Sequence, residues 1–265
     1  MVIEGKVMAE YVNIEQAVTM SGLRVVLPPG IPGPWAEAVK GILYAKKIPF
    51  TRVRHDRADY SPLIKWTAQS SVPVIVYNDE RPRSVWSDQL FLAERLQPSP
   101  ALVPASIEDR VLMFGLSNEL CGENGFGWSR RLMLIQSAVT DPKAPEETRK
   151  GMLAFGSKYG YSPAAAAAAP SKVAQILQAL AARQDSQRSR GSRFLIGDGL
   201  TALDIYWAVF AALIEPLPEN LCSMLPDFRR LYICEDPMVR GAITPQLLAH
   251  RDFIYQEYLE LPVDL

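Results

Sequence analysis

One short stretch of the sequence contains groups that could hold a peptide. Val72-Pro73 opens an apolar run, Val74 to Tyr77, which predicts a strand. A proline removes one main-chain donor and therefore belongs at the start or the edge of a strand. If the Val72-Pro73 bond is cis, the chain turns sharply and the main chain of Val72 faces outward. Such a main chain could pair with an extended peptide as one more strand would.

Ser87 lies at the predicted start of the following helix and could hold an anionic group. Trp86-Ser87-Asp88 comes after a turn-rich segment, residues 78–82, and a second predicted strand, Arg83 to Val85. Main-chain N–H groups in the first turn of a helix lack intrahelical partners and favour a carboxylate. Ser87 could equally be a plain N-cap, which contributes about 1 kcal/mol relative to alanine. Val72 and Ser87 together predict a site for a small acidic peptide.

The surrounding elements predict an α/β domain. Leu23 to Leu27 and Phe50 to Arg54 are runs rich in branched residues, which predict strands. Between them, a proline opens a predicted helix over residues 34–46. A strand, a helix and a strand in this order predict a right-handed parallel unit. A weaker helix, Tyr60 to Ala68, comes before the two strands around Pro73.

Beyond residue 97 the sequence predicts helices only. Gln97 to Pro100 is typical of a linker. One long helical stretch, Ile107 to about Ile135, has a glycine-rich middle that should break it. We therefore divide the chain into an N-terminal extension, an α/β domain, a linker and an all-helical domain, which comprise residues 1–21, 22–97, 98–105 and 106–265.

The helical domain contains two segments that we expect to be irregular and one helix that should be buried. Ala164 to Ala169 lies between two prolines and predicts one helical turn or a spacer. Residues 183–193 predict an exposed polar loop. Thr201 and Asp204 have the spacing of a capping box. The helix that follows, Ala202 to Ile214, is apolar nearly all round and should therefore be buried.

Composition excludes several kinds of partner. The 265 residues are 48% hydrophobic, enough for a sizeable core, and the net charge of −1 argues against nucleic acid or an anionic membrane as a partner. No window approaches the roughly 20 apolar residues of a membrane helix, and the N-terminal sequence lacks a signal-peptide run, so we expect a soluble cytoplasmic protein. The three cysteines form no CxxC pair and the chain has only two histidines, so we expect a reduced protein without a metal site.

In their order and spacing, these features resemble the cytosolic glutathione transferase family over nearly the whole chain, from about Leu23 to Tyr258. Three segments are similar to the family's cis-proline strand, its Glu-Ser or Gln-Ser pair and its helical-domain folding motif, namely Ser71-Val72-Pro73-Val74-Ile75, Trp86-Ser87, and Phe194 to Asp198 with Thr201 to Asp204. The resemblance implies a thioredoxin-like α/β domain, then an all-α helical-bundle domain, and pairing of two chains as a homodimer.

The resemblance also implies a glutathione-binding site. Val72 would pair with the cysteinyl main chain of glutathione, and Ser87 with its helix start would hold the γ-glutamyl carboxylate. Pro73 and Trp86 belong to the same site, although Trp86 replaces an acidic or amide residue of the family, so that one polar contact is missing. For the glycyl carboxylate, the candidates are Arg57 and Lys65. Glutathione would be the co-substrate, and no metal is implied.

The sequence departs from the family at the catalytic position. Residues 33–37, Gly-Pro-Trp-Ala-Glu, resemble the family's Cys-Pro-Phe-Ala-Glu or Ser-Pro-Phe pattern, so Gly33 stands where the catalytic Cys or Ser would be. A helix N-terminus favours an anion by ~0.3–1 kcal/mol, whereas one pKa unit equals about 1.4 kcal/mol. The helix can therefore lower the pKa of a bound thiol by less than one unit. Besides the main-chain N–H groups near Gly33, a transferase would need another donor.

The helical domain offers candidates for that donor and for a substrate pocket. In this family its first long helix crosses the glutathione cleft. Asn118 or Trp128 could supply an N–H there, and Arg130 or Arg131 a positive charge, although the arginines could equally face solvent or a partner subunit. A hydrophobic substrate could contact several apolar side chains, which could equally belong to the core, namely Trp35, Phe114, Cys121, Phe126, Trp128 and Met133.

Three functions follow from this interpretation. We favour an enzyme, a transferase that conjugates glutathione to a small, hydrophobic electrophile. The alternative is a non-catalytic glutathione- or ligand-binding protein that has lost its thiol-activating residue, since Gly33 occupies that place. The third is a disulfide or glutathionyl reductase, which would need Cys121 to substitute for the missing cysteine, whereas a lone helical cysteine is more often a small buried hydrophobe.

Overall fold

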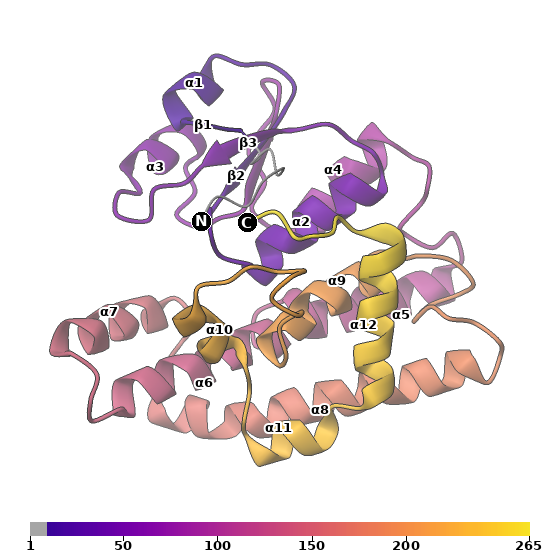
Figure 1. Cartoon of the computed structure of the whole chain (residues 1–265). Coiled ribbons are helices and arrows are strands. Elements are labelled where there is room, and N and C mark those ends of the chain that lie inside the picture. The colour runs from indigo at the N-terminus through magenta and orange to yellow at the C-terminus, as the bar shows by residue number, and fades with distance from the viewer. Residues whose placement is uncertain (1–9) are drawn as a thin grey trace. The chain divides into compact units, whose positions relative to one another are not determined.

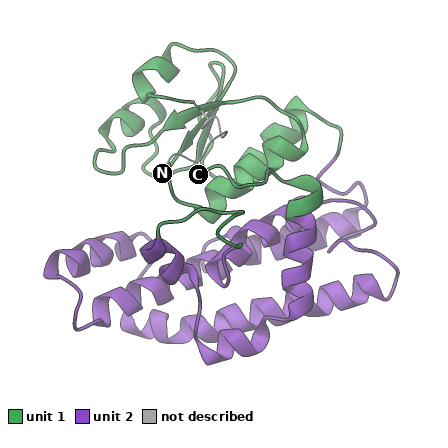
Figure 2. Ribbon diagram, viewed as in Figure 1, with its two compact units in different colours: residues 1–100, 217–225, 255–265 green, residues 101–216, 226–254 purple. Residues whose placement is uncertain are grey.

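The computed structural model describes residues 10–265 of the chain, which belong to two compact units (Figures 1 and 2). Unit 1 comprises residues 1–100, 217–225 and 255–265, and unit 2 comprises residues 101–216 and 226–254. The first nine residues of the predicted N-terminal extension lie outside the described residues. The predicted domain boundaries stay a prediction.

Unit 1 is built on a four-stranded sheet in the order β1-β3-β2-β4. Its strands are β1 (Tyr11–Val12), β2 (Leu23–Leu27), β3 (Thr51–Arg54) and β4 (Val74–Tyr77). β3 runs parallel to β1 and β2, and β4 runs antiparallel to β2. The parallel pairing of β2 with β3 confirms the predicted unit. The expected strand over residues 83–85 is wrong, because only one bridge forms there, between Ile75 and Arg83.

Helices cover both faces of this sheet (Figure 1). They are α1 (Ile14–Val18), α2 (Pro34–Ala45), α3 (Ser61–Thr67) and α4 (Trp86–Leu96). Asn13 starts α1 in a capping box with Gln16, and prolines lie in the first turns of α2 and α3. α1 and α3 pack against each other, as do α2 and α4. The core under α1 and α3 consists of Ile14, Ala17, Val26, Val53, Leu63, Val74 and Val76.

Unit 2 contains helices only within its described residues. They are α5 (Ile107–Cys121), α6 (Phe126–Thr140), α7 (Glu146–Ser157), α8 (Pro163–Arg188), α9 (Ala202–Phe210), the 3-10 helix η1 (Ala211–Leu213), α10 (Pro226–Tyr232), α11 (Pro237–Ala242) and α12 (Pro245–Tyr258), the last of which belongs to unit 1 from residue 255 on. α9 is buried along its whole length, as predicted, and packs against α5.

The break between α5 and α6 agrees with the sequence prediction, whereas the course of α8 differs from it. The glycine-rich break between α5 and α6 was predicted, and a Cβ at Gly125 would lie only 2.5 Å from the Glu119 carbonyl oxygen, so the chain passes too closely for a side chain. Residues 164–169, expected to form one helical turn or a spacer, are helical, so the spacer is wrong, and α8 continues through Pro170 instead of ending after one turn. The exposed loop expected from residue 183 is also wrong up to Arg188, which ends α8.

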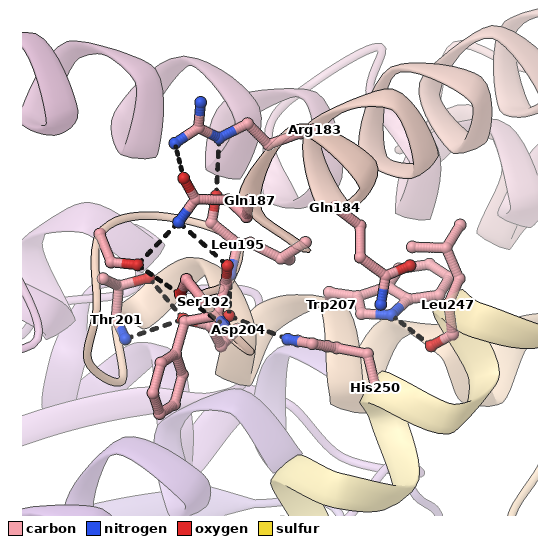
Figure 3. A network of polar contacts seen from close by, with 12 residues as sticks. Arg183, Gln184, Gln187, Ser192, Leu195, Thr201, Asp204, Trp207, Leu247 and His250 are labelled. Atoms are coloured by element: carbon pink, nitrogen blue, oxygen red, sulfur yellow. Dashed lines mark hydrogen bonds and ion pairs between the residues drawn. The ribbon is translucent and has the colours of Figure 1, made fainter. Parts of the chain in front are cut away.

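A buried network around Asp204 fixes the start of α9 (Figure 3). One carboxylate oxygen of Asp204 accepts from the Thr201 N–H at 2.9 Å and from its hydroxyl at 2.7 Å. The other oxygen accepts from the Leu195 N–H at 2.7 Å and lies 3.0 Å from Nε2 of His250. Gln187 donates to the Gly197 carbonyl at 2.7 Å. Both carboxylate oxygens of Asp204 are satisfied inside the fold, so we assign this network to folding and not to a ligand site, although Nδ1 of His250 has no hydrogen-bond partner among the described residues.

Candidate functional site

The main chain of Val72 is not used by the sheet of unit 1. The Val72-Pro73 peptide bond is cis, and β4 begins only at Val74, which lies opposite Val26 of β2. Within the part of the chain that the structure describes, neither the N–H nor the C=O of Val72 forms a hydrogen bond. The residue is half-buried. Because main-chain polar groups normally find a partner, this donor and acceptor are available to an extended ligand.

Side chains hold the loop that carries Val72 on both sides. The buried amide nitrogen of Gln89, in α4, donates to the carbonyl of Pro73 at 3.0 Å and to that of Arg83 at 3.2 Å. The Ser84 hydroxyl lies 2.6 Å from the side-chain oxygen of Gln69. The sequence offered no signal for Gln89, because both of its partners are carbonyls that only the folded loop brings together.

Ser87 lies in the first turn of α4 but is not its N-cap. The cap is Val85, which has no side chain that could bond to the helix, so the N-cap interpretation of Ser87 is wrong. Among the described residues, neither the main-chain N–H nor the hydroxyl of Ser87 forms a hydrogen bond. The neighbouring carboxylate of Asp88 lies 3.2 Å from Arg81. The first turn of α4 therefore offers Ser87 as a donor to an anion.

Gly33 is the N-cap of α2 and has room for a side chain. Its φ of −65° and ψ of 120° suit any L-residue, and the nearest atom to an added Cβ would be Cβ of Ala36 at 4.0 Å. Its N–H, however, donates to the carbonyl of Ile31 at 2.8 Å, and Pro34 has no N–H. Of the main-chain N–H groups near Gly33, that of Gly33 itself is therefore already used, and the expectation that the others stabilise a thiolate stays a prediction.

Arg57 lies beyond the end of β3, beside a cavity of about 770 Å³ that Pro29 and His55 also line. The Arg57 side chain is exposed and forms no ion pair within the described residues. His55 is only 2% exposed, and its ring contacts that of Tyr60 at a centroid distance of 4.4 Å. Burial lowers the pKa of His55, so its ring is neutral at neutral pH.

Two of the four side chains expected to act as donors in unit 2 are engaged inside that unit. The indole N–H of Trp128, in α6, donates to the carbonyl of Tyr159 at 2.9 Å. Arg130 is buried, and its Nε donates to the carbonyl of Leu213 at 2.7 Å. The alternative in which Arg130 faces solvent is therefore wrong. Asn118, the third candidate, is exposed near the end of α5.

Cys121 and the aromatic residues of the expected substrate pocket have different surroundings. Cys121 is buried at the end of α5, and burial raises the pKa of its thiol well above the usual value. This makes thiolate scarce and argues against Cys121 as a nucleophile, and so against the reductase. Phe126 is a core residue whose ring lies 6.3 Å from that of Trp207. Half-buried positions are occupied by Trp35, Phe114, Trp128 and Met133.

The described residues show neither a metal-binding group nor a membrane-spanning helix. They contain no group of three or more His, Cys, Asp or Glu side chains that could hold a metal ion. Among their helices, none combines the length and the apolar character that crossing a bilayer requires.

Comparison with known proteins identifies the fold. No protein-family model matches the sequence, and no curated protein matches it. Several solved structures do match it. A glutathione S-transferase from Methylobacillus flagellatus KT with GSH bound is 13% identical, with a TM-score of 0.58 over 89% of this chain and 96% of that chain. The beta-etherase LigF from Sphingobium sp. strain SYK-6 is 17% identical, with a TM-score of 0.58 over 88% of this chain and 94% of that chain.

A third structure extends the similarity to a plant protein. The Tau class glutathione S-transferase MiGSTU from mango, Mangifera indica, is 18% identical, with a TM-score of 0.51 over 88% of this chain and 98% of that chain. At such identities the similarity is one of fold. The chain therefore has the glutathione transferase fold, with the thioredoxin-like α/β part and the all-helical part that the sequence predicted.

Proposed function

We propose that this chain binds glutathione, with Val72 and Ser87 as its two main contacts. The observation that carries the proposal is the unpartnered main chain of Val72, within the described residues, beside a helix start whose Ser87 is also unpartnered. The cysteinyl main chain of glutathione would pair with Val72, and its γ-glutamyl carboxylate would bind Ser87. The structure with bound GSH among those of similar fold supports this ligand.

Three further residues would complete the binding site. Pro73 fixes the direction of the loop, and Trp86 is half-buried at the start of α4 beside Ser87. Arg57 would bind the glycyl carboxylate, since it is exposed and has no ion-pair partner in the described part of the chain. None of the proposed contacts with glutathione needs a metal ion.

We propose conjugation of the bound thiol to a small, hydrophobic electrophile as the reaction. Transferases among the proteins of similar fold support it. The second candidate is binding without catalysis. It is supported by the missing side chain at Gly33, by the use of its N–H on Ile31, and by the internal bonds of Trp128 and Arg130.

The first experiment separates these functions. Calorimetric titration with glutathione should give saturable binding, and a generic aromatic electrophile should then be conjugated. Ser87→Ala should raise the Kd for glutathione about 10-fold, equal to about 1.4 kcal/mol, because a bond to a carboxylate is lost. Ser99→Ala, at an exposed serine, is the control. Binding without turnover would leave only the non-catalytic function, and no binding would refute the proposal.

Comparing Gly33→Ser with Gly33→Ala tests whether the site lacks only the side chain that activates the glutathione thiol. Both side chains have room, since the nearest atom to an added Cβ is 4.0 Å away. The serine can bond to a thiolate and the alanine cannot. We expect conjugation to be about 10-fold faster with serine than with alanine, at similar Kd for glutathione. Equal rates would mean that position 33 does not lie beside the thiol.

We also propose a homodimer and a cytoplasmic location. α5 exposes the apolar side chains of Ile107 and Val111, which lie four residues apart on one face and are 60% and 64% exposed, and that of Leu112 beside them, which is 43% exposed. A face of this kind supports contact with a second copy of the chain. The three cysteines are all buried and none is in a disulfide within the described residues, which supports a reducing compartment.

A further inference from the structure

Gln89 is a buried polar residue that belongs to neither half of the proposed binding site. It lies in α4 two residues after Ser87 and is only 4% exposed. Its amide nitrogen donates to the carbonyl of Pro73 at 3.0 Å and to the carbonyl of Arg83 at 3.2 Å. A glutamine amide has two N–H donors, so both are used, and both bond to carbonyls outside α4.

These two bonds connect the segments that carry Val72 and Ser87. Pro73 follows Val72 directly, so a bond to its carbonyl fixes the main chain beside the free N–H and C=O of Val72. Arg83 is itself held to β4, because its N–H and C=O each bond to Ile75 at 2.9 Å. One buried amide therefore fastens α4 to the loop and to the sheet.

The other end of the same loop has a separate attachment. The hydroxyl of Ser84 lies 2.6 Å from the side-chain oxygen of Gln69, and both residues are half-buried. This contact holds the loop on the side before Val72, but it does not reach α4. Only the bonds of Gln89, among the hydrogen bonds of the described residues, join α4 to Pro73.

We infer that Gln89 is a positioning residue, whose amide sets the spacing between the Val72 main chain and Ser87 so that both can hold one ligand. The inference rests on the proposed glutathione site. A ligand held at two points binds tightly only when the points are already placed, because otherwise part of the interaction energy is consumed in ordering the protein. Being buried, Gln89 acts through these two residues and does not touch the ligand.

Gln89→Met tests the inference with two peptides. Methionine keeps the length and packing of the side chain and removes both donors. Glutathione uses both halves of the site, whereas cysteinylglycine has the cysteinyl main chain for Val72 but no γ-glutamyl carboxylate for Ser87. We expect the Kd of glutathione to rise about 10-fold and that of cysteinylglycine to change by less than about twofold, measured by NMR titration of the folded protein.

Two comparisons separate positioning from a general structural role. Leu92→Val loosens a buried position of α4 that has no bond to Pro73, and should lower the melting temperature without changing the Kd of glutathione. In a Gln89→Met background, Ser87→Ala should weaken glutathione less than it does in the wild type, because Ser87 is already misplaced. If Gln89→Met does not fold, Gln89→Asn keeps the amide, shortens its reach and gives the same comparison.

The outcomes distinguish this inference from the proposal beneath it. An equal loss of both peptides in Gln89→Met, or an equal loss of glutathione in Leu92→Val, would give Gln89 a structural role only. Unchanged binding of glutathione in Gln89→Met would refute the inference and leave the glutathione site intact. Failure of the wild type to bind either peptide would instead refute the proposed function.

Discussion

Two buried side chains of unit 1, Arg24 and His55, differ in how their polar atoms are satisfied. The terminal nitrogens of Arg24 donate to the carbonyls of Ala17 and Met20, at 3.1 and 2.5 Å, and to that of Asn78. Arg24 therefore holds the segment after α1 to the sheet. Neither ring nitrogen of His55 has a hydrogen-bond partner among the described residues. Buried polar groups without partners destabilise a fold, so His55 lowers the free energy of unfolding.

His55→Phe should change the pH dependence of stability. Burial lowers the pKa of His55, an effect that Arg57 increases and Asp56 opposes. The unfolded chain therefore binds the proton more readily, and stability falls as the pH decreases from about 6.5 through the pKa in the folded state, by at most about 1.4 kcal/mol per pH unit. Phenylalanine removes this loss and keeps an aromatic ring against Tyr60.

Urea unfolding of the wild type and His55→Phe between pH 5 and pH 8 is the measurement. We expect the two stability curves to run in parallel above about pH 7 and to separate below about pH 6.5, where the wild type loses more. Parallel curves over the whole range would mean that His55 does not titrate differently in the folded and unfolded chain.

At the scale of single residues, the sequence predicted part of the candidate site. Val72 and Ser87 could be found because a proline at a strand start and a serine at a helix start are local signals. Gln89 could not, since its partners become neighbours only when the loop folds. The burial of Arg130 was missed because an arginine is expected in water, and the carbonyl that accepts its N–H comes from Leu213, far along the chain.

At the scale of elements, α8 departs most clearly from the sequence prediction. Ser162 caps its start, with its hydroxyl oxygen accepting from the Ala165 N–H at 3.1 Å, and Pro163 suits its first turn. Pro170 was expected to interrupt the helix, because it lacks an N–H and crowds the preceding turn. α8 nevertheless packs along α6 and buries one side, so tertiary contacts outweigh the local cost.

Pro170→Ala should therefore stabilise unit 2. Alanine restores the donor that bonds to the carbonyl of Ala166 and removes the crowding by the ring, which together cost up to ~3 kcal/mol in a helix interior. Part of this gain is offset because the unfolded chain becomes more flexible by up to ~1 kcal/mol. We expect a net gain of about 2 kcal/mol in the free energy of unfolding, measured by denaturant titration.

Pro163→Ala is the matched control for this prediction. Pro163 lies in the first turn of α8, where its N–H would have no partner in the helix. The same replacement there should leave stability unchanged or lower it slightly. A loss of stability in Pro170→Ala would mean that the packing of α8 depends on the proline ring.

The other elements were predictable to different degrees. The β2-α2-β3 unit has branched strands and a proline at the helix start, so both periodicity and boundaries agree with the structure. β1 is only two residues long and carries no pattern. The expected strand at residues 83–85 has strand-like composition, but its contact with β4 is a single bridge at Arg83. Short elements are decided by neighbours and not by their own sequence.

At the scale of the whole molecule, unit 1 is assembled from separate stretches of chain (Figure 2). Residues 255–265 return to it, and the Asp264 carboxylate lies 3.3 Å from Nε of Arg52 in β3. The Asp264 carbonyl accepts from the buried Lys40 of α2, which also pairs with Glu37 at 3.0 Å. The Val263 N–H donates to the carbonyl of Leu221 at 2.7 Å.

Removing residues 259–265 should therefore destabilise unit 1. The deletion removes the buried side chains of Leu259 and Val263, and burying each of them stabilises the fold by about 1.5–3 kcal/mol. It also leaves the Lys40 ammonium without the Asp264 carbonyl that accepts its hydrogen bond. We expect thermal unfolding to begin at a lower temperature. Glu260→Ala is the control, because its contact with Arg52 at 3.6 Å is half exposed and contributes at most about 1 kcal/mol.

Val111→Glu tests the proposed homodimer. A charge at Val111, which is 64% exposed and shares a face of α5 with Ile107, should prevent association, so that light scattering gives a dimer for the wild type and a monomer for the variant. Leu153→Glu, at an apolar residue of α7 that is 45% exposed, should leave the dimer intact. A monomeric wild type, or a dimer unaffected by Val111→Glu, would refute this interface.

The return of residues 255–265 to unit 1 has a consequence for how the protein is made. A ribosome completes all of unit 2 before it adds this stretch, so the α/β part that begins the chain is among the last parts to be finished. During synthesis its sheet and helices lack the contacts of Val263 and Asp264 until these residues are added. Domains that consist of one continuous stretch can instead fold as soon as they emerge. Translation that stops near residue 254 would yield a chain whose helical part is whole and whose earliest part is incomplete.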